Sequence, residues 1–422
     1  MPTYDADLHL HSKYSGGTSP RMVIRELARG ARRKGLDLVG TGDILHPRWR
    51  RHVRRELERD EYGLLRDPRT GVRFVPTVEI EDRDRVHHLV ILPSLDAAED
   101  LYEELRPYSP DIEEEGRPRV DLSGAELVDL LKERECLVGP AHAFVPWTSV
   151  FKEYDSLSEC YGDAVDRVDF VELGLSADSD YADRISELHR YTFLTCSDAH
   201  SPYPHRLGRE FVRLELEEPS YDAIKAAIRR KPGGRVVLNV GLVPELGKYN
   251  RTACARCKRQ FTLEEAERLN WRCPECGGRI KKGVRDRVLE LADLDEPRHP
   301  KHRPPYLRIV PLSELIAKAL GLSTVTAKKV NAVWNALVRR FGSEIDVLVE
   351  APPEEVAEVD ERVARLLRAF REGSVRIRPG GGGRYGEILV GEEEDGEEGE
   401  EEGPRTGGGR VVQRTLDELL RG

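Results

Sequence analysis

The chain has 422 residues, more than one compact domain usually holds, so we expect two or three domains. Its formal net charge is −10, which alone argues against nucleic-acid binding, because phosphate contacts need clustered Lys and Arg. No stretch approaches the ~20 consecutive apolar residues of a membrane span, and no signal-peptide pattern opens the chain. With 34% charged residues and only two Met, these features predict a cytoplasmic protein of thermophile-like composition.

The acidic charge is concentrated near the C-terminus. Residues 391–403 contain nine carboxylates and no basic side chain, so the rest of the chain has a net charge of only about −1. The Gly and Glu density over 387–410 predicts a flexible linker, because such a segment buries too little apolar area to fold. The negative net charge therefore comes almost entirely from this linker, and it does not argue against nucleic-acid binding by the rest of the chain.

Residues 1–240 alternate short apolar runs with amphipathic segments. One such segment opens with Ser123 and carries Glu126 three residues later, which is the spacing of a helix capping box. Strands that alternate with helices indicate a parallel α/β sheet or barrel, in which reactive residues gather where the strands end. A polar residue closes or follows nearly every apolar run, so we expect the functional site at these strand ends.

Ten of the twelve histidines precede residue 206, most of them at the ends of separate apolar runs. On a strand, His9 and His11 project from the same face, which suits two ligands of one metal. Adjacent divalent ions generate hydroxide at neutral pH and stabilise in-line phosphoryl displacement. We therefore predict a phosphoester-hydrolysing centre with two or three divalent ions (Zn²⁺, Mn²⁺ or Mg²⁺), whose candidate ligands are His9, His11, Asp43, His46, Glu79, His87, His88, His142, Glu172, Asp198 and His200.

Five elements occur in a fixed order: DLHLHS, GTGD, Glu79 followed by a His pair, GPAH and SDAH. In that order they resemble the polymerase and histidinol phosphatase (PHP) family. The resemblance implies an α/β fold, a distorted (β/α)7 PHP barrel over residues 1–240, with a trinuclear metal cluster. It also implies that one metal is held by His9, His11, Glu79 and Asp198, and a second by Glu79, His142 and one of His87 and His88, with His87 preferred because the family's His-x-Leu spacing fits it.

The third metal site departs from the family pattern, since residues 15–17 (Ser-Gly-Gly) stand where the family usually has His or Asp. Asp43, His46 and His200 are left to complete that site. Glu172 stands where the family often has a carboxylate near the cluster, although an ordinary strand-end residue explains it equally well. The catalytic candidates are Glu79, His142, Asp198 and His200, of which His142 or His200 is expected to orient the water or the leaving group.

Four later cysteines follow the pattern Cys-x2-Cys-x15-Cys-x2-Cys, which is the ligand spacing of a structural Zn²⁺ site with two knuckles. Two disulfides are the alternative, which is poor without a secretory signal. Between Lys248 and Arg287 the local charge is +7, which favours a nucleic-acid clamp over a purely structural staple. We expect this ribbon over 241–290, with zinc ligands Cys254, Cys257, Cys273 and Cys276 and DNA contacts from Arg256, Lys258, Arg259, Lys281 and Lys282.

Two further regions are candidates for DNA binding. Residues 291–386 predict a mostly α-helical domain that resembles helix-hairpin-helix repeats, although Asp360-Glu361-Arg362 replaces the usual Gly-hydrophobic-Gly hairpin, so a packing role is equally consistent. A basic segment with an aromatic residue follows the second metal motif and is expected to grip a DNA backbone and stack on a base. The alternative is an exposed Arg-rich helix face; the residues concerned are Arg48, Trp49, Arg50 and Arg51.

Residues 411–422 resemble a peptide that binds the sliding clamp (PCNA). A short helical turn would bring Leu416, Leu419 and Leu420 to one face, with Gln413 preceding them. A terminal helix that docks on its own domain is the alternative. Presentation beyond a flexible linker favours clamp binding.

The order of the modules resembles the endonuclease Q family of DNA repair nucleases over essentially the whole chain. That resemblance implies a monomeric endonuclease that hydrolyses the phosphodiester 5′ of deaminated bases (uracil, hypoxanthine, xanthine) and abasic sites. A histidinol-phosphatase-like enzyme acting on small molecules is the first alternative, but it gives no reason for the basic ribbon or the terminal peptide. A non-catalytic DNA-binding scaffold is the second, and it predicts no metal at the His and carboxylate cluster.

Overall fold

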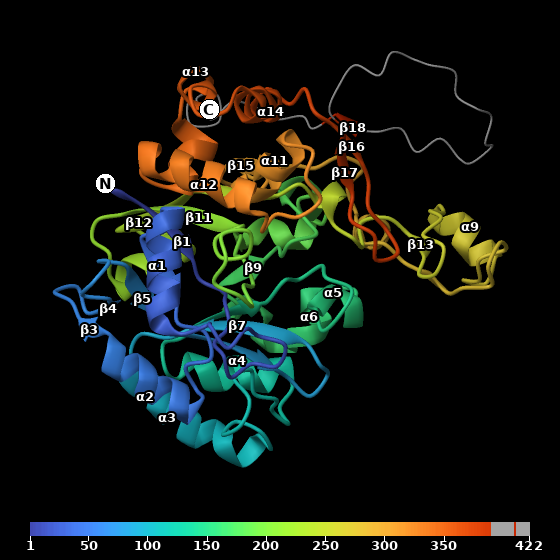
Figure 1. Cartoon of the computed structure of the whole chain (residues 1–422). Helices are drawn as coiled ribbons and strands as arrows, with labels where there is room; N and C mark the ends of the chain where they lie inside the picture. Colours follow the sequence, from blue (N-terminus) through green and yellow to red (C-terminus); the bar gives the residue numbers. More distant parts are fainter. Residues whose placement is uncertain (390–408, 411–422) are drawn as a thin grey trace, which may run out of the picture.

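A computed structural model describes residues 1–389 and 409–410 of the chain (Figure 1). Its N-terminal part is an irregular ring of short strands. β1 (Thr3–Asp7) lies parallel to β2 (Leu38–Gly40), and β2 lies parallel to β5 (Arg73–Val75). β5 leads through Pro76 into β6, and the ring continues with β6 (Thr77–Glu81), β7 (His87–Ile91), β8 (Leu137–Pro140), β9 (Phe170–Glu172) and β10 (Thr192–Leu194).

Hydrogen bonds close this ring. The Asp169 amide donates to Val138 O at 2.9 Å, β9 pairs with β10 in parallel, and a bridge between Leu10 and Ala199 joins the extensions of β10 and β1. With β5 and β6 counted as one bent strand, residues 1–240 contribute seven strands to the ring, which confirms the predicted α/β barrel. The β6–β7 and β7–β8 pairings are antiparallel, because residues 82–86 are too few for a helical crossover and β7 turns straight back on β6.

The helices of the N-terminal part follow the amphipathic segments. The capping box at α4 is present as predicted, since the Ser123 hydroxyl accepts from the Glu126 amide and the Glu126 carboxylate accepts from the Ser123 amide. Leu127, Val128 and Leu131 of the same helix are fully buried. The helices are α1 (Ile24–Lys34), α2 (Pro47–Glu56), α3 (Leu95–Leu105), α4 (Gly124–Lys132), α5 (Val150–Glu153), α6 (Leu157–Tyr161), α7 (Ser179–Ala182) and α8 (Tyr221–Ile228).

One sheet of eight strands connects the N-terminal and C-terminal parts. Its order is β15-β12-β11-β1-β2-β5-β4-β3. The later strands β11, β12 and β15 therefore lie on one side of β1, and the early strands β2 to β5 lie on the other. β11 runs antiparallel to β1, β12 antiparallel to β11, and β15 parallel to β12. The added strands are β3 (Glu58–Arg59), β4 (Leu65–Arg66), β11 (Phe211–Leu216), β12 (Gly234–Leu242) and β15 (Tyr306–Ile309).

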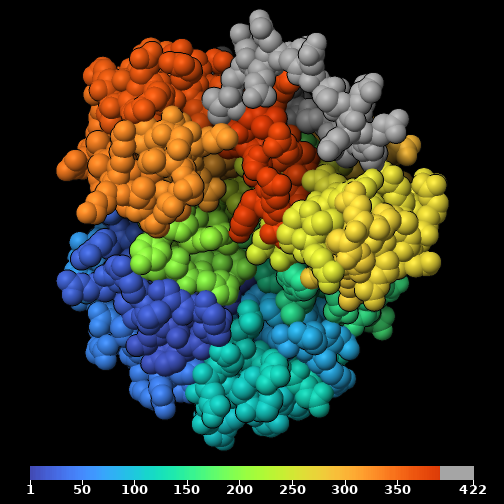
Figure 2. All heavy atoms as spheres, turned by 45° about the vertical axis from the view of Figure 1, so that its right-hand side comes forward, coloured from blue at the N-terminus to red at the C-terminus, as the bar shows by residue number. Residues whose placement is uncertain are grey.

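The ribbon forms a small unit with its own core at the side of the molecule (yellow in Figures 1 and 2). Cys254, Phe261, Ala266, Cys273 and Ile280 make up that core. In a unit this small the apolar core alone gives little stability, so a bound metal is expected to contribute. Its elements are β13 (Ala253–Cys254), α9 (Leu263–Arg268), β14 (Ile280–Lys281) and α10 (Val284–Leu291).

The C-terminal part is mostly helical, as predicted, and lies above the barrel in Figure 1. Asp360 caps α14, where its carboxylate accepts from the amides of Arg362 and Val363. Because a carboxylate already satisfies these amides, this turn does not offer them to a DNA phosphate, and DNA binding by the region stays a prediction. The helices are α11 (Leu312–Ala319), α12 (Lys328–Phe341), α13 (Pro353–Ala357) and α14 (Glu361–Arg371), with a π-helical turn over Asp346–Glu350.

The segment predicted as a linker, 387–410, starts and ends in strands. β17 (Glu387–Leu389) and β18 (Gly409–Arg410) both pair with β16 (Arg376–Arg378), one on each side. The acidic run and the segment predicted to bind the sliding clamp, with Gln413, Leu416, Leu419 and Leu420, lie outside the described residues. Among the helices of the described part, none is long and apolar enough to cross a membrane.

A buried ion pair fastens the C-terminal part to α1. Glu344 Oε1 accepts from Lys34 Nζ at 2.8 Å and from the Leu312 amide at 3.0 Å, while Oε2 accepts from Trp334 Nε1 at 2.6 Å. The Lys34 and Glu344 side chains are 2% and 0% exposed. Such a pair is weak support for stability as a whole, but loss of one partner leaves the other charge buried without compensation.

Replacing Glu344 by Ala should therefore lower the free energy of unfolding by about 3–5 kcal/mol. Urea unfolding followed by circular dichroism measures this change. Arg365→Ala, which removes an exposed ion pair with Glu361 on α14, is the control and should leave the midpoint unchanged. Equal midpoints for the two variants would contradict the anchoring role of Glu344.

Candidate metal centre

Imidazole and carboxylate groups from separate strand ends converge at one end of the barrel. Three groups of side chains each place their ligand atoms within 4.8 Å of one another. They share Glu79 and His11, so they form one continuous centre rather than three separate sites. The groups are His9 with His11 and Glu79, His11 with Asp198 and His200, and Glu79 with His87 and His142.

The first two groups fit a metal because their buried ring nitrogens lack partners. Within the described residues, the Nε2 atoms of His9 and His11 accept and donate no hydrogen bond, although both side chains are about 1% exposed or less. His11 Nε2 lies 3.4 Å from Glu79 Oε2 and 3.2 Å from Asp198 Oδ1, and His9 Nε2 lies 3.6 Å from Glu79 Oε1. Buried polar atoms are normally satisfied, so this convergence indicates a site that a cation completes.

Asp43 and Glu172 lie on the outer side of the two imidazoles. Glu172 Oε2 lies 2.8 Å from His9 Nδ1, and Asp43 Oδ1 lies 3.2 Å from His11 Nδ1. This is the carboxylate–histidine–metal arrangement, in which the carboxylate fixes the ring and its tautomer. Both residues belong to the centre as predicted, but their contacts are with the imidazoles, which indicates positioning rather than metal ligation.

The structure separates the two histidines of the 87–88 pair. His87 Nδ1 lies 2.9 Å from Glu79 Oε1, and His142 Nε2 lies 2.8 Å from the same oxygen. His88 points to the other face of β7, where it contacts Tyr161 Oη at 2.9 Å and an Asp82 oxygen. Successive residues of a strand face opposite sides, so His87 belongs to the centre and His88 does not.

His46 is not among the converging groups. It is the N-cap of α2, where its Nδ1 accepts from the Trp49 amide at 3.3 Å, and its ring stacks on Tyr14 at 4.1 Å between centroids. The prediction of His46 as a metal ligand is therefore corrected: its ring nitrogen serves the first turn of a helix. His200 takes the open side of the centre, with 36% of its side chain exposed.

Arg117 is a member of the site that the sequence did not indicate. Its Nη1 donates to Glu79 Oε2 at 3.2 Å, and 29% of the side chain is exposed. Burial lowers the pKa of Arg117, but the carboxylates around it, Glu79 foremost, outweigh burial and raise this pKa above its usual value. Arg117 lies in no recognisable motif, and the sequence shows only a basic residue in the loop after Gly116. Tertiary contact alone brings it to the centre.

Strained backbone positions present several of these groups. Asp43, His142 and Asp198 have φ values of 49°, 31° and 46°, in the left-handed region that residues other than Gly rarely adopt. Gly174 itself has φ 73° and packs so closely that a Cβ there would lie 2.7 Å from His142 Cβ. Such conformations persist where surrounding structure determines them, and they concentrate at functional sites.

The basic segment near α2 contributes less surface than predicted. Trp49 is fully buried, and its Nε1 donates to Gly42 O at 2.7 Å. Arg50 is 6% exposed and donates to the carbonyls of Ile44 and Leu45. The stacking role predicted for Trp49 and the DNA contact predicted for Arg50 are therefore wrong, because both side chains hold the second metal motif in place. Arg48 and Arg51 are exposed.

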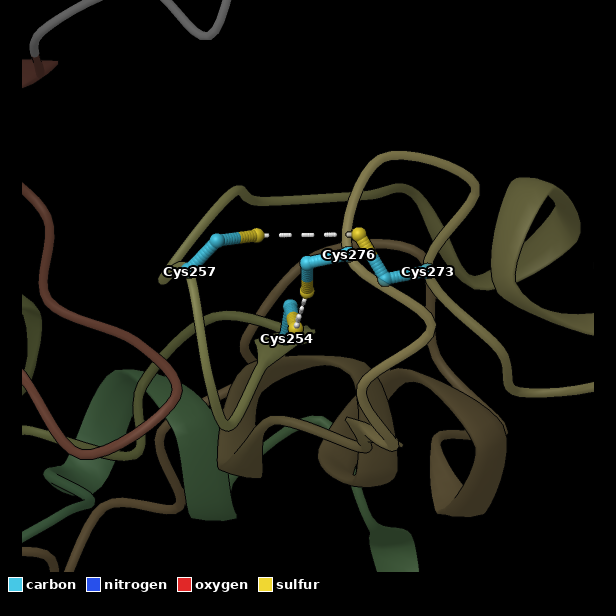
Figure 3. Close-up of side chains that lie close together, drawn as sticks. All are labelled: Cys254, Cys257, Cys273 and Cys276. Carbon is cyan, nitrogen blue, oxygen red and sulfur yellow. Dashed lines mark hydrogen bonds between the residues drawn. The ribbon is translucent and has the colours of Figure 1, made fainter.

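The four cysteines of the ribbon face one another (Figure 3). Cys254 Sγ lies 3.4 Å from Cys276 Sγ, and Cys257 Sγ lies 3.6 Å from Cys273 Sγ. A tetrahedral zinc site with Zn–S distances of about 2.3 Å separates its sulfurs by a similar distance. The residues fit a structural metal, and these four cysteines form no disulfide with one another.

The predicted DNA-contacting residues of the ribbon fall into two sets. Lys258 Nζ donates to Ala255 O and Gly382 O, and Arg256 Nη1 donates to Cys276 O. These two cations therefore stabilise the backbone of the ribbon. Arg259 pairs with Glu275 in the same unit. Lys281 and Lys282 lie instead on the side that faces the barrel, where both line a cleft.

Comparisons with known proteins place the chain in a family. A family model described as the MJ0043 C-terminal domain matches residues 311–374. The uncharacterized protein MJ0043 of Methanocaldococcus jannaschii is 46% identical over 252 residues; the match covers 58% of this chain but only 31% of that protein. The uncharacterized protein YqxK of Bacillus subtilis is 31% identical over 405 residues, covering 91% of this chain and 98% of that one.

Two solved structures are similar over almost the whole chain. The lesion-specific endonuclease PfuEndoQ from Pyrococcus furiosus shares 49% identity, with a TM-score of 0.89 and coverage of 93% of this chain and 96% of that one. An endonuclease Q in complex with a 27-mer duplex that has an abasic lesion at the active site also shares 49% identity, with a TM-score of 0.88 and coverage of 93% and 98%. Together with the His and carboxylate centre, this close match over almost the whole chain supports a metal-dependent endonuclease. The chain belongs to the endonuclease Q family, which confirms the resemblance seen in its motifs.

In the metal-free protein, the two central histidines are protonated at neutral pH. Burial lowers the pKa of His9, but the carboxylates of Glu172 and Glu79 outweigh burial and raise it to about 9. Burial opposes the same effect at His11, where Asp198 and Asp43 raise the pKa to about 10. A metal binds only the neutral imidazole, so metal binding must displace these protons.

Adding Mn²⁺ at pH 7 to protein stripped of its cluster metals should therefore release about two protons, and the apparent affinity should rise with pH up to about 10. Mn²⁺ is chosen because thiolates bind it poorly and the ribbon does not compete. Calorimetry in buffers of different protonation enthalpy measures the release. His302→Gln, at an exposed position away from the centre, is the control, and binding without proton release at pH 7 would refute the assignment.

Proposed function

We propose that the chain is a DNA repair endonuclease that hydrolyses the phosphodiester 5′ of deaminated bases and abasic sites with a multinuclear metal centre. The observation that supports this most is the convergence of His9 and His11, through unpartnered buried Nε2 atoms, on Glu79 and Asp198. The solved relatives described as lesion-specific and as bound to an abasic duplex support the choice of substrate. Incision next to uracil, hypoxanthine and xanthine rests on the sequence resemblance.

The centre can be divided into groups that hold metals and groups that act around them. Divalent ions held here would supply an activated water and would stabilise negative charge on the phosphate oxygens. Asp43 and Glu172 fix the rings of His11 and His9, so the ligand geometry is set before DNA binds. The metal-holding groups would be His9, His11 and Glu79, with Asp198 Oδ1 3.9 Å from His9 Nε2, then Glu79, His87 and His142, and then His11, Asp198 and His200.

Arg117 and His200 line the open side of the centre. Arg117 keeps one guanidinium nitrogen on Glu79, and 29% of its side chain is exposed, so it can donate to a non-bridging oxygen of the scissile phosphate. His200 is the more exposed imidazole, within reach of solvent and of a leaving oxygen, and its Nδ1 lies 3.0 Å from Asp198 O. Arg117 is our candidate for orienting the phosphate. His200 is our candidate for handling a proton at the leaving 3′ oxygen in the case where it does not ligate a metal.

Asp198→Asn should reduce incision of a uracil-containing or abasic duplex below detection, because it removes a negative charge that lies next to both His9 and His11. Asp43→Asn should lower the incision rate by about 10- to 100-fold, since it disturbs the orientation of His11 without removing a ligand. Labelled duplexes with one lesion each, resolved on a sequencing gel, measure both the rate and the cut position.

Asp222→Asn, on the exposed face of α8, is the matched control for both variants and should cut like the unchanged protein. Full incision by Asp198→Asn would refute the assignment of the centre. Turnover of a sugar or amino-alcohol phosphate with no cleavage of DNA would favour the small-molecule phosphatase. Absence of any metal beyond that of the ribbon would favour the scaffold.

We further propose that residues 411–422, which follow β18, bind the sliding clamp through Gln413, Leu416, Leu419 and Leu420. A chain that ends at Arg410 should lose co-elution with purified PCNA on gel filtration and should keep its basal incision rate. The substitution of Leu419 and Leu420 by Ala tests the same contact in the full chain. Unchanged co-elution of both variants would contradict clamp binding.

A further inference from the structure

A basic cleft of about 480 Å³ lies at the end of the barrel opposite the metal centre. Two of its lining residues, Asp169 and Tyr191, immediately precede β9 and β10. Glu172 and Asp198 of the metal centre close or follow the same two strands, which run parallel. A ligand of this cleft would therefore lie on the far side of the barrel from the cutting site.

Positive charge dominates the lining of this basic cleft. Asp169 compensates two of its cations, since its carboxylate pairs with both Lys132 and Arg229. Two further carboxylates pair singly with Arg167 and Arg190. The basic lining residues are Lys132, Arg167, Arg190, Arg229, Arg230 and Lys231. The last two pair with no carboxylate in the described part of the chain, so their charge is available to an anion.

Arg230 occupies a strained backbone position at the end of α8. Its amide donates to Ala227 O at 3.2 Å, and the Lys231 amide donates to Ala226 O at 2.8 Å. This pair of bonds ends a helix with one left-handed residue, for which Gly is the common choice. Arg230 takes that place with φ 54°, although Gly233 lies only three positions later. A cation kept where Gly is favoured indicates a role for its side chain.

The guanidinium of Arg230 is held in place but is not saturated. Nη1 donates to Thr192 Oγ1 at 3.2 Å, and Nη2 donates to Arg190 O at 2.7 Å. A guanidinium has five N–H donors, so these two bonds orient the group and leave donors for a ligand. Arg230 and Lys231 are both exposed. An oriented guanidinium without a carboxylate, next to a lysine, suits recognition of a phosphate by paired hydrogen bonds.

We propose that this basic cleft binds the phosphate group of a small molecule, with Arg230 as the hydrogen-bonding cation and Lys231 as a compensating charge. The cleft volume falls in the range of small-molecule pockets and exceeds that of one phosphate ion. Tyr191, the aromatic residue in the lining, is only 3% exposed, so no open ring is offered to a base. The site goes beyond the proposed function, because DNA at the metal centre lies at the other end of the barrel.

Arg230→Gly separates a binding role from a structural one. The change relieves the left-handed backbone, so the unfolding midpoint should stay equal or rise. Binding of inorganic phosphate by the metal-loaded protein should nevertheless weaken by about 10- to 100-fold at this site. Calorimetric titration measures the affinity. Arg230→Met should weaken binding similarly, and Arg25→Met, which removes an exposed cation of α1 that has no ion pair, is its matched control.

Tungstate, a heavy-atom analogue of phosphate, locates the ion, because the metal centre also attracts phosphate. Crystals of the full-length protein are soaked in tungstate, and the ion is found by its anomalous scattering. We expect tungstate on Arg230 in the unchanged protein and none there in Arg230→Gly, with any ion at the metal centre present in both.

Three results would overturn the inference. Tungstate in the basic cleft without phosphate binding in solution would indicate an adventitious ion only. Equal phosphate affinity of Arg230→Met and Arg25→Met would exclude the cleft as a phosphate site. Weaker binding of a lesion-free duplex by Arg230→Gly, with unchanged phosphate binding, would assign Arg230 to a DNA backbone instead. None of these measurements depends on incision, so failure of the proposed function is seen separately.

Discussion

The compensation of buried negative charge at one end of the barrel is the constraint on which the rest of the structure depends. Asp43, Glu79 and Glu172 are almost completely buried, and an uncompensated carboxylate there costs several kcal/mol. Imidazoles, one guanidinium and, when bound, divalent cations supply the opposite charge. The short strands and strained turns of the barrel have to bring these groups within a few ångströms of each other, so the fold is organised around this site.

Each imidazole of the inner group has a carboxylate on one side and an unpartnered nitrogen on the other. This asymmetry assigns roles to residues of the same chemical type. Glu172 and Asp43 hold the Nδ1 side of His9 and His11, while Glu79 faces the Nε2 side of both. Ligand and positioning carboxylates are therefore distinguished by which ring atom they approach, which no count of residues along the sequence can show.

The ribbon and the helical part are connected to the barrel in different ways. The helical part shares the eight-stranded sheet through β12 and β15 and is fastened at Glu344, so it is continuous with the barrel core. The ribbon has its own small core around the cysteines, and its last helix, α10, packs Val284 and Val288 into the large core. Arg287 of the same helix donates to the carbonyls of Phe151 and Tyr154. A unit built this way forms one wall of a cleft against the barrel.

The sequence by itself determined the type of chemistry, the order of the modules and most members of the centre. Short local patterns in the sequence predicted the histidines and carboxylates at strand ends and the four zinc-binding cysteines. The capping box of α4 is an equally local pattern. Which of these residues point inward was decided by tertiary structure: His87 rather than His88, a capping role for His46, and the burial of Trp49. Arg117 lies in no recognisable motif, because it reaches the centre only where segments distant in sequence meet, and only the packed chain determines that contact.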